Sequence, residues 1–166
     1  MDPGPTAYIN DGSPEHTAEQ QWTNQNTFAA YLIRGSSDSP CNFDYLYQSA
    51  FRVIADSLEW DARTAEGMDS LHSLRAAMRW IEIAGEEIWQ RAKMDGSAVA
   101  GPLWLTEMHR RHIDLEGSNA HSLITPARWL WWADRLHELA ESNMIDEEAK
   151  IMARSSAHKM RRIQED

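Results

Sequence analysis

Apolar residues recur every three to four positions through most of this chain, which is the spacing of amphipathic helices. The clearest stripe covers residues 43–60, and similar stripes over 69–94 and 125–142 predict two further helices. The flanking segments 17–34 and 146–166 have helical patterns of their own. Since no stretch alternates with the period of a β-strand, we expect an all-α fold, a compact bundle of about five helices.

Two segments interrupt the helical pattern. Residues 1–16 contain three prolines and two glycines, which predicts a flexible leader before a single helical domain at 17–166. Residues 95–124 form a long connection between the third and fourth helices, with a short helical turn expected at LTEMHRRH. Connections of this length are uncommon in compact domains and often carry function.

Charge and motif content narrow the class of protein. The chain has 16 Lys and Arg against 26 Asp and Glu, a net charge of −10, so we expect neither nucleic acid nor a membrane surface as a partner. The N-terminus lacks a secretory signal pattern, and we interpret the single cysteine, Cys41, as an inert thiol. We therefore expect a cytoplasmic protein. Phosphate-binding loops, dinucleotide fingerprints and Cys-based metal motifs are missing from the sequence, so we expect no cofactor.

Three tryptophans fall within four positions of the stretch TPARWLWWADRL. At 100° per residue, Trp129 and Trp132 lie on the side of the helix that Leu136 continues, so we expect both in the core. Trp131 shares another face with Arg128, and we expect it to pack under the long connection or against another chain.

The remaining tryptophans allow two interpretations. Indole rings that converge between helices would line an apolar pocket for a hydrophobic or aromatic small molecule. Alternatively, they simply form a tryptophan-rich core. In the first case the binding residues are Trp89, Trp104, Arg128, Trp129 and Trp131.

Histidines in the long connection are candidates for acid–base chemistry. His109 and His112 share a face if this part is helical, and either can transfer a proton near neutral pH. Together with His121 or Asp114 they could instead bind zinc, although the spacing matches no metalloprotease motif. Solvated loop histidines remain the third interpretation.

Two groups of acidic residues are further candidates for a functional or structural role. Glu82 and Glu86 lie four residues apart on either side of Gly85, and this like-charge pair destabilises a helix slightly unless a cation neutralises it. The side chain of Arg75, Arg79 or Arg128 could do so. The sequence thus predicts a buried ion pair between the third and fourth helices, with Glu86 as a candidate catalytic group. Asp56, Glu59 and Asp61 could supply paired carboxylates, but Asp56 and Glu59 fall off the apolar stripe, so we expect a solvated face.

The motifs WTNQNTFAAYL, AMRWIEIAGEEIWQRA, GPLW and RWLWWADRLHELAES occur in this order. In this respect the chain resembles a fungal family of uncharacterised helical proteins, a domain of unknown function, over about residues 20–160. The family crosses the gap after GPLW in fewer residues, so the histidine-bearing insert is peculiar to this member. The resemblance brings no catalytic residues, and it implies a setting near natural-product pathways.

Three functional hypotheses result. The first is a small-molecule-binding protein that assists a cofactor-free cyclisation or isomerisation, with His109 or His112 moving a proton and Glu86 or Arg128 orienting the substrate. The second is a helical interaction or dimerisation module without activity, which would make a homodimer the partner. The third is a metal-dependent enzyme at the histidine-bearing connection.

Overall fold

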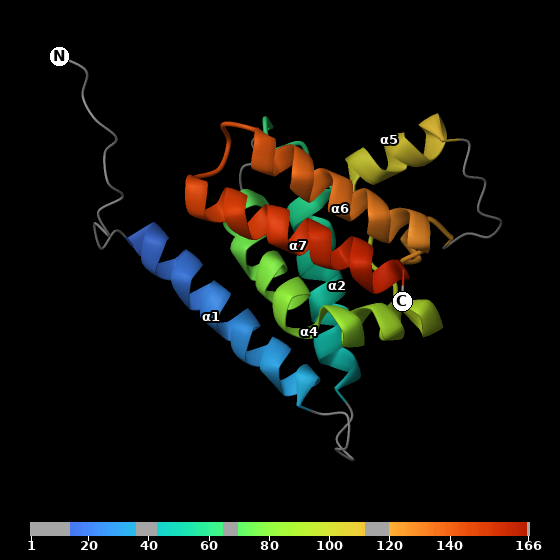
Figure 1. Ribbon diagram of the computed structural model, residues 1–166, viewed down its shortest axis with the longest axis horizontal. Helices are drawn as coiled ribbons and strands as arrows, with labels where there is room; N and C mark the ends of the chain where they lie inside the picture. Colours follow the sequence, from blue (N-terminus) through green and yellow to red (C-terminus); the bar gives the residue numbers. More distant parts are fainter. Residues whose placement is uncertain (1–13, 36–42, 65–69, 112–119, 166) are drawn as a thin grey trace.

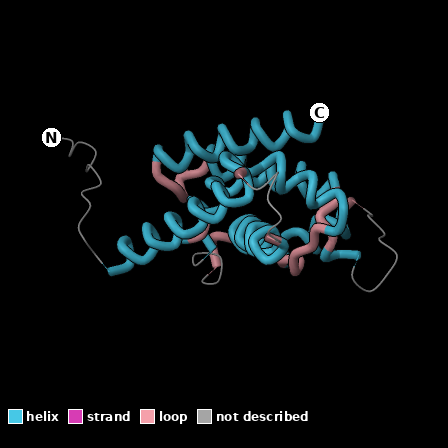
Figure 2. Tube along the Cα trace, turned by 90° about the horizontal axis from the view of Figure 1, so that it is seen from below, coloured by secondary structure: helices cyan, strands magenta, loops and turns pink. Residues whose placement is uncertain are grey.

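The computed structural model describes residues 14–35, 43–64, 70–111 and 120–165, and all statements below concern these residues. Regular structure in this part of the chain is helical throughout (Figure 2). The all-α class expected from the periodicity is therefore confirmed. None of the described helices is long and apolar enough to cross a bilayer.

Six α-helices and one short 3₁₀ turn make up the described fold (Figure 1). They are α1 (Pro14–Arg34), α2 (Asp44–Leu58), α4 (Leu74–Asp95), α5 (Pro102–Arg110), η1 (Ala120–Ser122), α6 (Pro126–Glu141) and α7 (Glu147–Glu165). About five helices were expected. The sixth is α5, because the short turn predicted at LTEMHRRH is a full helix that starts at Pro102. Helix α1 begins at Pro14, within the predicted leader.

Helix α4 is the centre of the bundle, because α1, α2 and α7 all pack against it. It bends at Ala84, whose φ of −126° and ψ of 24° are not helical. The next residue, Gly85, faces α7 so closely that a Cβ there would lie 3.0 Å from Ile163 Cδ1. A glycine at this position therefore lets α7 approach α4 closely.

The start of α6 follows the expected capping pattern. Thr125 Oγ1 accepts a hydrogen bond from the backbone N–H of Arg128 at 3.2 Å, and Pro126 occupies the first turn. The helix then packs mainly on α7. This cap fixes where the residues of the first turn of α6 point, and Arg128 is the most consequential of them.

Candidate functional site

The tryptophans of α4 and α6 lie in the core. Trp129 and Trp132 are fully buried, as predicted, and Trp89 is nearly so. The ring centroids of Trp89 and Trp129 are 5.1 Å apart, and those of Trp129 and Trp132 are 6.1 Å apart. The Trp129 indole N–H donates to the carbonyl of Met160 on α7 at 3.0 Å. These rings therefore fill the space between helices with direct contacts.

Trp131 points to a different side of α6 and packs on α5. Its ring centroid lies 5.4 Å from that of Trp104, which belongs to the connection between α4 and α6. Of the two packing partners expected for Trp131, the long connection is confirmed. The linings of the two hollows described below do not include Trp89, Trp104 or Trp129.

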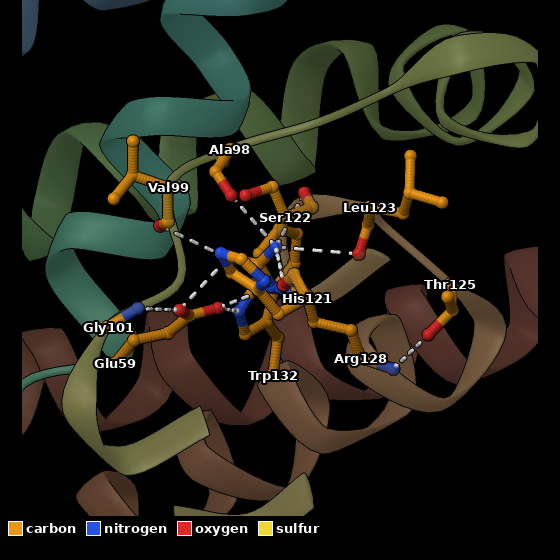
Figure 3. Close-up of polar contacts among 10 residues, drawn as sticks. All are labelled: Glu59, Ala98, Val99, Gly101, His121, Ser122, Leu123, Thr125, Arg128 and Trp132. Atoms are coloured by element: carbon orange, nitrogen blue, oxygen red, sulfur yellow. Dashed lines mark hydrogen bonds and ion pairs between the residues drawn. The ribbon is translucent and has the colours of Figure 1, made fainter. Parts of the chain in front are cut away.

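The strongest polar arrangement in the interior is an ion pair between Glu59 and Arg128 (Figure 3). Glu59 is the residue that ends α2, and Arg128 stands in the first turn of α6. Both side chains are completely buried. Arg128 Nε donates to Glu59 Oε1 at 2.7 Å and Nη2 donates to Oε2 at 2.9 Å, so the pair is bidentate.

Further donors complete the coordination of the Glu59 carboxylate. The Trp132 indole N–H donates to Oε1 at 2.7 Å, and the backbone N–H of Gly101 donates to Oε2 at 2.6 Å (Figure 3). Trp132 is one helical turn beyond Arg128, which places both donors on the same face of α6. With four donors on two oxygens, the carboxylate has no acceptor site left for a ligand.

Arg128 also binds the two chain segments that flank α5. Its Nη1 donates to the carbonyls of Ala98 at 3.0 Å and Ser122 at 2.9 Å. These segments are joined to each other by an isolated antiparallel bridge between Ser97 and Leu123. We call the contacts of Glu59 and Arg128 with both segments the Glu59–Arg128 clamp, since it holds α2, α6 and both flanks of α5 together.

The clamp corrects two expectations from the sequence. Glu59, expected in solvent, is fully buried, and the buried ion pair joins α2 to α6 rather than the third predicted helix to the fourth. Glu82 instead accepts a hydrogen bond from Ser156 on α7, and Arg75 pairs with Asp146. Because Arg128 is buried and its donors are engaged, it is unavailable as the substrate-orienting residue.

An open groove of about 610 Å³ lies at the C-terminal half of α4. We call it the Glu86 groove. Helices α2 and α7 contribute one wall residue each, and α4 contributes the rest. Its lining consists of Tyr47, Glu86, Glu87, Gln90, Arg91, Met94 and Ile163.

The Glu86 groove carries excess negative charge. Arg91, its one lining cation, lies 3.2 Å from a carboxylate oxygen of Asp44 and 3.2 Å from one of Asp95. Glu86 and Glu87 form no ion pair with any described residue. Burial, and next the charge of Glu87, raise the pKa of the Tyr47 phenol. A cation is therefore the ligand charge that this groove favours.

A second hollow of about 520 Å³ lies between α5 and α6. Its lining consists of Glu107, Arg110, Arg111, Trp131, Asp134, His137 and Glu138. Its charges are largely paired within the protein: Arg110 Nη2 lies 2.6 Å from Glu107 Oε1, and Arg161 lies 2.9 Å from Asp134. The hydrogen bond from Arg110 lowers the pKa of the Glu107 carboxyl to about 2. Paired charges of this kind leave little to attract an ionic ligand.

The candidate histidines lie apart from the Glu86 groove. His109 is exposed on α5, and His121 is exposed on the turn η1. His112, Asp114 and Cys41 lie outside the described residues. Among the residues that are described, no three His, Cys, Asp or Glu side chains converge as metal ligands.

No curated protein and no solved structure matches this chain. A family model does match, over residues 6–136, from before α1 into α6. This match confirms the resemblance to an uncharacterised domain that the tryptophan motifs indicated. The chain belongs to the family described as "Protein of unknown function (DUF3632)".

Proposed function

We propose that this protein binds a small organic cation, an amine with an apolar body, in the Glu86 groove. The observation that carries the proposal is that two carboxylates, Glu86 and Glu87, line the groove without an ion pair to any described residue, while its cation, Arg91, is paired with Asp44 and Asp95. A volume of about 610 Å³ falls within the range of known small-molecule sites. The proposed ligand keeps the hydrophobic or aromatic body expected from the sequence and carries a positive charge as well.

Each part of the groove has a separate task in this proposal. The carboxylates of Glu86 and Glu87 attract the ammonium group. The Arg91 guanidinium already lies 6.0 Å from the centroid of the Tyr47 ring, so this ring serves the ligand as aromatic surface. Met94, whose side chain is 75% exposed, folds over the apolar body of the ligand. Methionine suits this task because its unbranched side chain adapts to different shapes. Ile163 supplies apolar surface from α7.

The proposal is for binding without turnover. Glu86, considered from the sequence as a catalytic group, serves here as a binding carboxylate. His109 belongs to α5, which contributes no residue to the groove, so the proton transfer considered for it has no place at this site. Anionic ligands are disfavoured by Glu86 and Glu87 and by the net charge of −10.

Isothermal titration calorimetry tests the proposal with three matched probes: arylalkyl amines, and the alcohols and carboxylic acids of the same size. We expect the amines alone to bind, and more weakly as salt is added. Exposed charge pairs contribute about 0.2–1 kcal/mol each, so Glu86→Gln with Glu87→Gln should weaken amine binding roughly two- to thirtyfold. Glu138→Gln, in the hollow between α5 and α6, is the matched control and should leave the affinity unchanged.

Two results would overturn the proposal. One is equal affinity for amines, alcohols and acids, which would make the contact purely apolar. The other is an equal loss of amine binding in the groove double variant and in Glu138→Gln. Retention of an amine in native mass spectra of the purified protein would identify the natural ligand directly.

A further inference from the structure

Helix α1 carries no charged residue between Glu19 and its last residue, Arg34. Residues 20–33 contain no Asp, Glu, Lys or Arg, although such residues make up 25% of the whole chain. An ordinary surface helix of an acidic protein carries several carboxylates. Loss of charge combined with aromatic enrichment is the compositional mark of the centre of a protein–protein interface.

One side of α1 is already used for the fold. Thr23, Asn26, Ala30 and Ile33 are buried on the side that packs against α4. The amide oxygen of Asn26 accepts a hydrogen bond from the indole N–H of Trp80 at 2.8 Å. Because this inner side anchors the helix, the residues on the outer side are not needed to hold α1 in place.

The outer side of α1 presents large apolar groups instead. Phe28 is 65% exposed and Tyr31 is 57% exposed, and Trp22 and Leu32 are also exposed. Figure 1 shows α1 along one edge of the bundle, with no other described helix on its outer side. Amide side chains, including Gln21 and Gln25, occupy the positions between the apolar ones. We call these six residues the α1 outer face.

We infer that the α1 outer face is the contact surface of a reversible homodimer. Two copies with a net charge of −10 repel each other, and the α1 outer face adds no charged residue of its own to the contact. Aromatic rings and amides, which both donate and accept hydrogen bonds, are complementary to themselves. A membrane surface suits the face poorly, since it has none of the Lys and Arg of interfacial helices.

Helical spacing sets the arrangement of this dimer. Gln21, Gln25, Phe28 and Leu32 are separated by four, three and four residues, so they form one stripe along the helix. A two-fold axis opposite the middle of this stripe pairs the helices antiparallel. Phe28 of each copy then lies against Gln25 of the other, and Leu32 lies against Gln21. Trp22 and Tyr31 stand at the two flanks of the contact.

The area of the contact indicates its strength. Helix α1 has 21 residues, which corresponds to a length of roughly 31 Å. A contact of that length and one helix width, about 10 Å, is smaller than the roughly 1,600 Å² of standard stable interfaces. We therefore expect monomer and dimer to exchange with protein concentration, in contrast to a permanent dimer.

Sedimentation velocity over a wide concentration range tests the inference on the full chain. The wild-type mass should rise from 19.0 kDa toward twice that value as concentration increases. Phe28→Glu and Phe28→Lys each place like charges near the two-fold axis, so each variant alone should remain a monomer. An equimolar mixture of the two should dimerise again, because opposite charges then meet. Ile151→Glu on α7 is the matched control, since Ile151 is 66% exposed, and it should dimerise as wild type does.

Three outcomes would overturn the inference: a wild-type monomer at every concentration, dimerisation of both Phe28 variants alone, or equal dissociation by Ile151→Glu. Failure of the mixed Phe28 variants to associate would overturn the antiparallel arrangement. Circular dichroism of each variant checks that the helices are retained, so that loss of the dimer is not mistaken for unfolding. The α1 outer face shares no residue with the Glu86 groove, so amine binding can fail while dimerisation holds, and the reverse.

Discussion

Replacement of Arg128 by methionine is the most demanding test of the Glu59–Arg128 clamp. The Arg128→Met variant keeps much of the side-chain volume but removes both hydrogen bonds to the Glu59 carboxylate. Breaking a fully buried ion pair from one side costs about 3–5 kcal/mol, because the remaining charge is buried without its partner. The carbonyls of Ala98 and Ser122 lose a donor as well. Against a total of roughly 5–15 kcal/mol for a domain, this brings the protein close to unfolding.

A double-mutant cycle separates the pair from its surroundings. Glu59→Leu alone should also lower the free energy of unfolding by about 3–5 kcal/mol, because it leaves the Arg128 guanidinium buried without its carboxylate. In the double variant neither charge remains, so its loss should be smaller than the sum of the two single losses by at least about 2 kcal/mol. Some loss should persist, since the N–H groups of Trp132 and Gly101 no longer have an acceptor.

Urea unfolding monitored by tryptophan fluorescence and by circular dichroism measures these free energies. Asp61→Asn is the control: it removes a carboxylate that lies 2.9 Å from the exposed Arg63, and because exposed pairs of this kind contribute little, it should cost far less stability than Arg128→Met. The reasoning is refuted if Arg128→Met lowers the free energy of unfolding by less than about 1 kcal/mol. Additive losses in the double variant would show equally that the two charges are not coupled.

Three further predictions concern neighbouring contacts. Gly101→Ala should lower the thermal midpoint sharply, because a Cβ at this position would lie 2.5 Å from Glu59 Cβ; a calorimetric scan unchanged from wild type would contradict this. Trp132→Phe removes one donor to the Glu59 carboxylate and should lower the free energy of unfolding in urea by about 1.5–3 kcal/mol, whereas a loss of a few tenths would show the bond to be dispensable. NMR titration should place the pKa of Glu107 at about 2, rising as salt screens Arg110. The stabilisation from this depressed pKa is present above the unfolded value of about 4.3 and is lost as pH falls through about 2, and an unshifted titration near pH 4 would exclude the ion pair.

The periodicity of the sequence predicted the helical class and most helix positions well. Stripes at 43–60 and 125–142 correspond to α2 and α6, and the Thr125 cap and the Gly85 approach to α7 are present in the structure. These features depend on neighbours along one helix, or on a small residue that leaves room for another. Local rules therefore suffice for them.

The clamp could not be predicted by the same rules. Glu59 and Arg128 are 69 residues apart, so no helical spacing relates them. A weak signal existed in hindsight: Glu59 stands between Leu58 and Trp60, and Arg128 opens the tryptophan-rich run. A charge in such a setting needs a partner if it is buried, but the sequence does not identify which of many oppositely charged residues that is.

The Glu86 groove was only partly foreseeable for a similar reason. The position of Glu86 beside Gly85 makes it a candidate from the sequence alone. Tyr47 and Ile163 belong to other helices, and only the tertiary packing brings these helices against α4. Trp129 packs against both Trp89 and Trp132, so these rings occupy space between the helices. Whether large rings enclose a cavity or occupy it depends on distances of an ångström or two, which residue types do not encode.

The bridge between the two segments that flank α5 has a consequence for how this protein tolerates changes in length. Ala98 N–H donates to the Ser122 carbonyl, and Ile124 N–H donates to the Gly96 carbonyl, each at 2.9 Å, so the base of the excursion is closed independently of its content. Once the ends are fixed, doubling the length of a flexible excursion adds only about 0.6 kcal/mol of closure entropy. Insertions after α5 should therefore cost the rest of the fold little stability, whether these arise by evolution or by grafting a reporter peptide.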